Sequence, residues 1–400
     1  MSKNTSILNA LGIPPLPSQS ADTIAALLWA REVLQKHLTA TYAVQDPSGI
    51  EELKPVKIGG VDQWLHIRGR NRNNPVLLFI HGGPGFRMIG TMDAIQRPWE
   101  DYFTVVHWDQ RQSGKSYNPS DSSDAPFTVD QFVNDATEVI QYLRQHLGQE
   151  KIFVLGHSWG SILGMHVAKR HPEWLHAYIG VGQIVNITDN LRIIHERLLG
   201  HAREQNETEV VDKLESIAPM LFQDPPELLK YFEENIGFLC RELSRLGSEI
   251  TMRHLFLDDF ASAWGFERSV SPHLTFTDLQ NDIIHGNSLS TGFWEAARRL
   301  MKDQMTVDLP KDIGCSFEVP IFFFSGRHDY QTPTTLSEQW FSKIEAPHKA
   351  VVYFENSCHM IFNEEPGKML TTLVNQVLPF AQSKAPQKLK AGVKQAEVTS

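Results

Sequence analysis

The chain has 400 residues, 41% of them hydrophobic, which is enough to bury a large core. Its formal net charge of -10 argues against a nucleic-acid partner, because nucleic acids are bound by basic surfaces. Three cysteines without metal-ligand spacing favour a reducing compartment, so we expect a cytoplasmic protein.

The first 50 residues form an N-terminal extension. Met1–Ser20 is polar and proline-rich without a continuous apolar stretch, so we expect no signal peptide. No segment approaches the ~18 consecutive apolar residues of a membrane span. Apolar residues at helical spacing predict a helix over Ile24–Leu38, which we interpret as a docking helix, with membrane association as the alternative.

Strand and helix patterns alternate over residues 51–182 and again over residues 311–382. The expected strands are Val56–Ile58, Gln63–Arg68, Pro75–Ile80, Phe103–Trp108, Lys151–Leu155, Leu175–Val181, Val319–Ser325 and Ala350–Phe354. Helices are expected over Val129–Leu147 and Ser161–Arg170. The first two strands form a predicted hairpin, and the later alternation predicts an α/β fold with a mostly parallel central sheet and helices on both faces.

The alternation stops over residues 183–310. Helical patterns follow one another there and are broken by prolines such as Pro219 and Pro272. We interpret this stretch as a helical cap inserted into the α/β core. Residues 383–400 contain few large apolar side chains and are predicted to be a mobile tail.

A G-x-S-x-G pattern, Gly156-His157-Ser158-Trp159-Gly160, joins a predicted strand to a predicted helix. Its two glycines allow a sharp turn that holds the serine hydroxyl at the N-terminus of the helix, where the helix dipole favours negative charge. This arrangement is typical of a nucleophile elbow. Ser158 is therefore the candidate nucleophile.

A nucleophilic serine needs a base that takes its proton and an acid that orients the base. In elbow enzymes the acid and then the histidine follow the serine, each on a loop after a late strand. Asp329 and His359 occupy these two loops and are the candidate orienting acid and general base. Asp312 and Glu318 are rivals for the acid, but both precede the strand whose far end carries Asp329.

Acyl transfer also needs backbone donors for an oxyanion. The turn His81-Gly82-Gly83-Pro84-Gly85 directly follows a predicted strand, and its glycines allow backbone amides to approach a ligand. Because proline has no N–H, the useful donors belong to Gly82 or Gly83. The second donor is expected at Trp159, the residue after the nucleophile.

Five segments together resemble the proline iminopeptidase-like branch of the α/β-hydrolases. They are His81-Gly82-Gly83-Pro84-Gly85, Trp108 to Ser116, Gly156 to Ser161, Gly326-Arg327-His328-Asp329 and His359. The resemblance covers about Glu51–Gly182 and Val319–Phe380. It implies the α/β-hydrolase fold and an enzyme that releases N-terminal residues, often proline, from small peptides or amides.

Three positions depart from the pattern of that family. Members usually have a glycine where Phe86 stands, a small residue or glycine near Gln112, and commonly a glycine where Cys358 stands. No catalytic atom is lost, but Phe86 borders the oxyanion turn and is a candidate for shaping the acyl pocket. We interpret Cys358 as a packing residue rather than a reactive thiol.

The chemistry predicted from these residues is acyl transfer through an acyl-enzyme, on a small molecule or short peptide. The resemblance favours an aminopeptidase of the proline iminopeptidase type. An esterase, amidase or lactonase acting on a small metabolite stays open, as does a non-catalytic or lyase member of the fold. We expect no cofactor and no metal, because no ligand spacing such as H-E-x-x-H occurs.

An aminopeptidase needs an anion for the terminal ammonium of its substrate. The carboxylates of the predicted cap that could serve are Asp189, Glu196, Asp258, Asp259, Glu267 and Glu295, and none is assigned. Aromatic residues there that could line a substrate pocket are Trp264, Phe266, Phe293 and Trp294. Such aromatics more often belong to a helix-packing core.

Overall fold

The computed structural model describes residues 23–118, 120, 127–217, 235, 238, 242, 268–285 and 293–382, so the N-terminal 22 residues and the predicted tail lie outside it. Its strands are β1 (Ile50–Ile58), β2 (Val61–Gly69), β3 (Val76–Ile80), β4 (Thr104–Asp109), β5 (Ile152–His157), β6 (Leu175–Val181), β7 (Ile321–Gly326) and β8 (Lys349–Phe354). Its longer helices are α2 (Thr23–Tyr42), α4 (Val129–Leu147), α5 (Trp159–Arg170), α6 (Ile187–Glu204), α7 (Thr208–Ile217), α11 (Phe276–His285), α12 (Phe293–Gln304) and α14 (Thr334–Lys343). Shorter helical segments are α3 (Asp93–Gln96), η1 (Trp99–Asp101), η2 (Gly114–Ser116), η3 (Pro172–Trp174), α13 (Leu309–Asp312), α15 (Ile361–Glu364), α16 (Pro366–Thr372), η5 (Leu373–Val377) and α17 (Pro379–Gln382).

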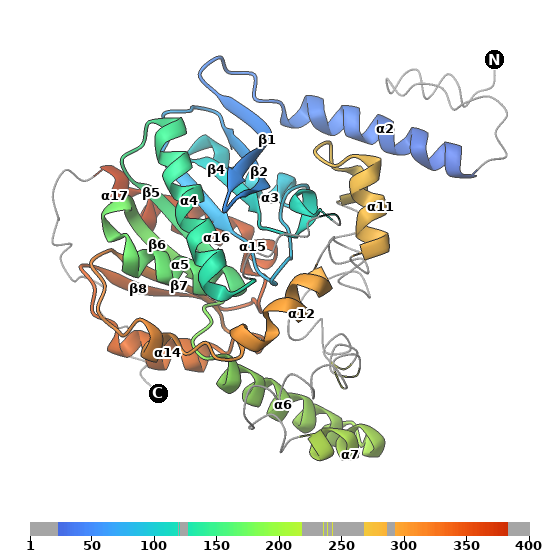
Figure 1. Cartoon of the computed structure of the whole chain (residues 1–400), viewed down its shortest axis with the longest axis vertical. Coiled ribbons are helices and arrows are strands. Elements are labelled where there is room, and N and C mark those ends of the chain that lie inside the picture. Colours follow the sequence, from blue (N-terminus) through green and yellow to red (C-terminus); the bar gives the residue numbers. More distant parts are fainter. Residues whose placement is uncertain are drawn as a thin grey trace, which may run out of the picture.

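An eight-stranded sheet with the order β1-β2-β4-β3-β5-β6-β7-β8 organises the fold (Figure 1). β1 and β2 form an antiparallel hairpin, and β2 pairs antiparallel with β4. The pairs from β4 through β3 to β8 are parallel, which confirms the predicted mostly parallel sheet. β1 begins at Ile50 rather than at Val56, because an edge strand with exposed positions lacks the apolar pattern that marks an interior strand.

Side-chain alternation along the strands divides the core into two layers. Val76, Leu78 and Ile80 of β3 pack with residues of α4, α5 and α14. Leu77 and Phe79 point to the opposite face and pack with residues of α15 and α16. Both faces of the sheet are therefore covered by helices, as predicted, and a strand buried on both faces must be apolar throughout.

The helix α4 begins and ends at the predicted residues for identifiable reasons. The hydroxyl of Thr128 accepts a hydrogen bond from the backbone N–H of Gln131 and caps the first turn. Gly148 adopts a left-handed conformation with φ of 65° and ends the helix. Phe132, Val133 and the other apolar residues at helical spacing face the core.

The chain leaves the sheet after β6 and returns before β7. The described helices in between are α6, α7, α11 and α12, and Figure 1 shows them beside and below the sheet. The two ends of this insertion pair with each other: Asn186 and Asp308 form an isolated antiparallel bridge, and the N–H of Leu309 donates to the carbonyl of Val185 (2.9 Å). This pairing puts both ends of the helical stretch at one point of the core, whereas its role as a cap stays a prediction.

The predicted N-terminal helix corresponds to α2, which extends away from the sheet towards α11 (Figure 1). Arg31 donates to the carbonyl groups of Ser269 (2.8 Å) and Leu274 (2.6 Å), and Gln35 donates to that of Ser271 (2.6 Å). Thus α2 contacts the insertion, consistent with a docking helix. In the described part of the chain, no helix is long and apolar enough to cross a membrane.

Candidate active site

Ser158 lies on a sharp turn between β5 and α5. Its φ of 53° and ψ of -121° are strained for a residue with a side chain. A Cβ added at Gly160 would lie 2.1 Å from the carbonyl oxygen of Ile80, so only glycine allows α5 to approach β3 this closely. The N–H of Ser158 donates to the carbonyl of Val181 (2.9 Å), which fixes the turn to the end of β6.

Asp329 and His359 follow β7 and β8 and bond to each other. The distance between Asp329 Oδ2 and His359 Nδ1 is 2.9 Å, and both side chains are buried. An ionised carboxylate only accepts hydrogen bonds, so Nδ1 carries the hydrogen and Nε2 keeps a lone pair. Nε2 is buried and has no hydrogen-bond partner among the described residues. It is therefore available to accept a proton.

Thr332 was missed by the sequence analysis and completes the surroundings of Asp329. Its hydroxyl donates to Asp329 Oδ2 (2.7 Å) and its backbone N–H donates to Oδ1 (2.8 Å). The same hydroxyl lies 3.2 Å from His359 Nδ1. Asp329 thus accepts three hydrogen bonds, which hold the carboxylate in the orientation that His359 requires. A threonine three residues after an acid is too common a pattern to indicate this role.

The His359 ring lies close to the turn that carries Ser158. A Cβ built on Gly182 would meet His359 Cε1 at 2.9 Å, and Gly182 directly follows Val181, the partner of the Ser158 N–H. The rings of His157 and His359 are 4.7 Å apart, and His157 Nε2 donates to the carbonyl of His359 (3.3 Å). Burial, followed by the neighbouring His359, holds the pKa of His157 well below its usual range, so this ring is a neutral support. The structure thus places Ser158, Asp329 and His359 at the carboxyl ends of the parallel strands.

The predicted oxyanion turn lies against the elbow. A Cβ on Gly82 would be 3.1 Å from Ser158 Cβ, a tight contact that shows how closely the turn approaches the elbow. Gly83 has a φ of 117°, a conformation that other residues rarely adopt. Trp159 is the first residue of α5, and its backbone N–H has no partner within the helix. The positions of these residues suit oxyanion donors, and that role stays a prediction.

Gln110 links the oxyanion turn to the elbow. Its backbone N–H donates to His81 Nε2 (3.2 Å), and its side-chain amide donates to the His81 carbonyl (2.9 Å). Its side-chain oxygen accepts from Trp159 Nε1 (3.0 Å). Because Nε2 of His81 is an acceptor, Nδ1 carries the hydrogen and donates to the carbonyl of Gly82 (2.8 Å). Burial lowers the pKa of His81 to about 4, so this arrangement persists at neutral pH.

All three positions that depart from the family pattern, Phe86, Gln112 and Cys358, are buried. Phe86 belongs to the hydrophobic cluster that contains Met88 and Met92, and its N–H donates to the carbonyl of Gly82 (3.1 Å). Cys358 is fully buried beside Gly326, whose added Cβ would meet the Cys358 carbonyl oxygen. Both residues pack next to the predicted site.

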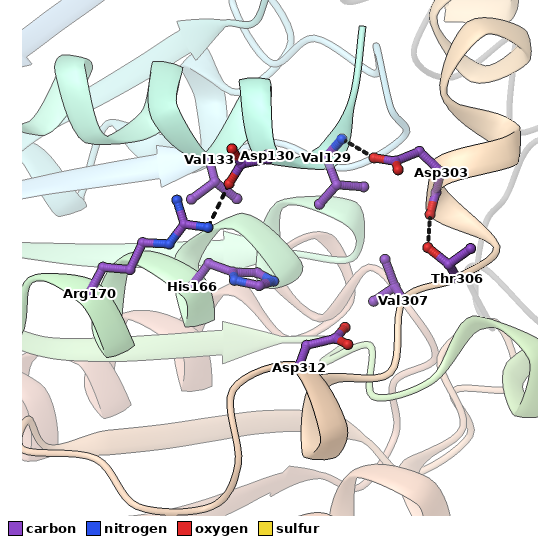
Figure 2. Close-up of a pocket in the computed structure, with 9 residues that line it drawn as sticks. All are labelled: Val129, Asp130, Val133, His166, Arg170, Asp303, Thr306, Val307 and Asp312. Carbon is purple, nitrogen blue, oxygen red and sulfur yellow. Dashed lines mark hydrogen bonds and ion pairs between the residues drawn. The ribbon is translucent and has the colours of Figure 1, made fainter. Parts of the chain in front are cut away.

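The rival acids Asp312 and Glu318 do not contact His359. Asp312 lines a pocket of about 230 Å³ between α4, α5 and the end of the insertion, which Figure 2 shows together with the Asp130–Arg170 ion pair. Glu318 is exposed. The pocket contains none of Ser158, Asp329 and His359. It is therefore not where the candidate nucleophile would meet a substrate.

The acidic and aromatic candidates of the insertion are only partly described. Asp189 is half-buried and Glu196 is exposed, and they pair with Arg192 at 3.7 and 3.0 Å, as solvated surface residues commonly do. Outside the described residues or side chains lie Asp258, Asp259, Glu267, Glu295, Trp264, Phe266, Phe293 and Trp294.

Comparison with known proteins identifies the family of the chain. A model of the alpha/beta hydrolase fold matches residues 75–212. A probable aminopeptidase, YbaC of Bacillus subtilis, is 34% identical over 335 residues, which cover 82% of this chain and 97% of that protein. The chain belongs to the proline iminopeptidase-like branch of the α/β-hydrolase superfamily.

More distant members of this branch are also similar to the chain. The proline iminopeptidase of Chitinophaga pinensis is 24% identical over 327 residues, covering 79% of this chain and 94% of that protein. The crystal structure of a Mycobacterium smegmatis proline iminopeptidase has a TM-score of 0.53 at 20% identity, covering 83% of this chain and 99% of that one. At this identity the structure supports the fold alone. The chain is thus a hydrolase of the α/β type.

Proposed function

We propose that this hydrolase is a serine aminopeptidase of the proline iminopeptidase type that works through an acyl-enzyme. Ser158 attacks the carbonyl carbon of the scissile amide, and His359 Nε2 takes the hydroxyl proton. His359 then returns that proton to the leaving amine. Water, activated by the same nitrogen, hydrolyses the ester on Ser158 and releases the free amino acid.

The observation that carries this proposal is the hydrogen bonding of the His359 ring. Asp329 holds Nδ1 at 2.9 Å, while Nε2 is buried without a partner among the described residues. Asp329 stabilises the imidazolium that forms after proton transfer, and Thr332 keeps the carboxylate in place. Contacts of the His359 ring with Gly182 support a position beside Ser158.

The oxyanion of the tetrahedral intermediate would be bound by backbone N–H groups of Gly82 or Gly83 and of Trp159. Such donors stabilise charge that develops only in the transition state. The close approach of Gly82 to Ser158 and the Gln110 bonds to His81 and Trp159 support this assignment.

An aminopeptidase substrate is favoured because the relatives that match most of the chain are named aminopeptidase or proline iminopeptidase. The predicted cap, residues 183–310, would supply the anion that binds the substrate ammonium. We further propose a cytoplasmic protein, in agreement with the small number of cysteines, three in 400 residues.

The test is a comparison of L-prolyl and other aminoacyl arylamides with their N-acetylated forms and with short-chain acyl esters. Acetylation removes the ammonium and leaves a buried anion without its partner, so kcat/KM should fall roughly 100-fold or more. Ser158→Ala is the control for background hydrolysis. Equal cleavage of free and N-acetylated substrates, or faster cleavage of esters, would replace the aminopeptidase by an esterase or amidase.

A further inference from the structure

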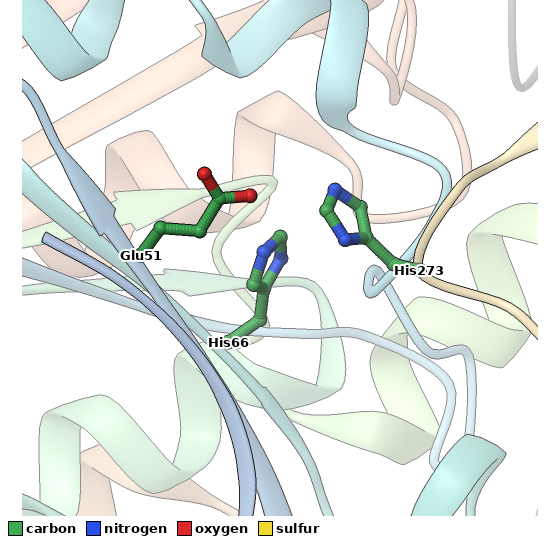
Figure 3. A group of neighbouring side chains, drawn as sticks. All are labelled: Glu51, His66 and His273. Carbon is green, nitrogen blue, oxygen red and sulfur yellow. The ribbon is translucent and has the colours of Figure 1, made fainter. Parts of the chain in front are cut away.

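Three potential metal ligands, two from the β1–β2 hairpin and one from the insertion, meet at the hairpin edge of the sheet. Glu51 is on β1, His66 is on β2, and His273 lies in the segment before α11 (Figure 3). One ligand atom from each residue lies within 4.8 Å of the other two, and the two imidazole rings are 4.1 Å apart. The cluster contains none of the residues proposed for catalysis.

His66 is the member whose surroundings need an explanation. It is 1% exposed, and neither of its ring nitrogens has a hydrogen-bond partner in the described part of the chain. Buried polar atoms without partners cost free energy, so an apolar residue would be more stable here unless something binds the ring.

Carboxylates complete the donor set. Glu51 bonds Arg68 through Oε1, and its second oxygen has no hydrogen bond within the described residues. Asp93 Oδ1 lies 3.4 Å from Nε2 of His273, in the manner of the carboxylates that orient metal-binding histidines. Imidazole nitrogen with carboxylate oxygen is a donor set typical of zinc and similar transition metals.

Two cations lie near the cluster, and each has a carboxylate partner. Arg68 pairs with Glu100 at 2.9 Å as well as with Glu51. Lys115 pairs with Asp278 at 2.8 Å. These ion pairs reduce the repulsion that an added divalent cation would meet.

We propose that Glu51, His66 and His273 bind a divalent transition metal of the zinc class, which fixes the segment before α11 to the sheet. Tetrahedral zinc with bonds of about 2.0–2.2 Å places its ligand atoms roughly 3.3–3.5 Å apart. Small rotations of the Glu51 side chain, which is 41% exposed, can close the present separation. Water fills the fourth position, and the metal has a structural role.

The test uses the full chain after treatment with a chelator and removal of the chelator. Zinc chloride is titrated by calorimetry, and bound zinc is measured by elemental analysis after dialysis. We expect one zinc per chain and a higher Tm in its presence. His273→Ala should weaken binding at least tenfold and abolish the rise in Tm. The matched control is His171→Ala, because His171 stacks on Trp174 in a different part of the molecule.

A second variant, Glu51→Gln, keeps the test decisive if His273→Ala does not fold. It removes one charged ligand from a partly exposed position, so zinc binding should again weaken while circular dichroism stays unchanged. Absence of zinc binding by the unmodified chain would overturn the proposal. So would zinc binding that is equal in the unmodified chain and in both cluster variants. None of these readouts depends on hydrolase activity.

Discussion

Replacing Gln110 by methionine should lower kcat more than it raises KM. Methionine has a similar length but cannot donate to the His81 carbonyl or accept from Trp159 Nε1, and these bonds measure 2.9 and 3.0 Å. The backbone bond from residue 110 to His81 Nε2 survives the change. The variant therefore loosens the link between the proposed oxyanion turn and the elbow, while Ser158, Asp329 and His359 stay intact.

The magnitude follows from the groups that lose partners. Two buried polar groups become unsatisfied, at about 1–3 kcal/mol each, so the free energy of unfolding should drop by roughly 2–6 kcal/mol. Loss of an oxyanion donor costs about 100- to 1000-fold in kcat, and a displaced donor should cost less. We expect kcat to fall about 10- to 100-fold and KM to change less than about threefold, since an oxyanion contact acts mainly in the transition state.

Gln63→Met is the matched control for Gln110→Met. Gln63 is also buried, accepts from the indole N–H of Trp108 (2.8 Å) and donates to the carbonyl of Ile58 (3.2 Å), but it touches neither the elbow nor the oxyanion turn. Steady-state kinetics with a cleaved arylamide and urea unfolding should be measured for both variants. If both variants lose stability and keep the same kcat, Gln110 is only a structural residue and the reasoning is refuted.

Three further results are expected. Ser158→Ala should lose at least ~1000-fold in kcat with an unchanged Tm, and a serine-directed phosphonate should no longer label the chain; persistent labelling would identify another nucleophile. Thr332→Val removes the hydroxyl bond to Asp329 and should lower kcat about threefold to tenfold, with recovery in Thr332→Ser. Unfolding in urea should become easier as the pH falls from 6.5 to 4. Burial lowers the pKa of His81 to about 4. Burial and the nearby His81 lower the pKa of His107 to about 3. Because both histidines bind more protons in the unfolded chain in this pH window, the free energy of unfolding should fall by about 3 kcal/mol for each histidine. His107→Leu should flatten this dependence, and an equal slope in both proteins would contradict the assignment.

Local patterns in the sequence were sufficient to predict most of the α/β core. The interior strand β3 is apolar at every position because both faces are buried, and α4 carries apolar residues at helical spacing between a threonine cap and a glycine. The edge strand β1 was underestimated, since exposure on an edge removes the apolar signal. Whether the insertion acts as a cap depends on packing between distant segments, which no local pattern reveals.

Some residues of the candidate site could likewise be predicted from the sequence, and others could not. Ser158, Asp329 and His359 could be predicted because each follows a strand in a recognisable order. Thr332 and Gln110 could not be assigned roles, because their partners are set by tertiary contacts rather than by spacing. The cluster of Glu51, His66 and His273 has no short ligand motif at all, and only the hairpin and the insertion bring its members together.

One segment of the insertion is attached to α2 mainly through its backbone. Arg31 and Gln35 of α2 donate to backbone carbonyl groups in residues 269–274, which any amino acid provides. On the core side, Lys115 pairs with Asp278 and also lies over the ring of Trp64. These contacts attach the segment around residues 269–278, and elsewhere the insertion packs into the core through Leu300, Val307 and Leu309. We propose that other positions of the insertion select the substrate, while the sheet holds Ser158 and its partners in the same geometry.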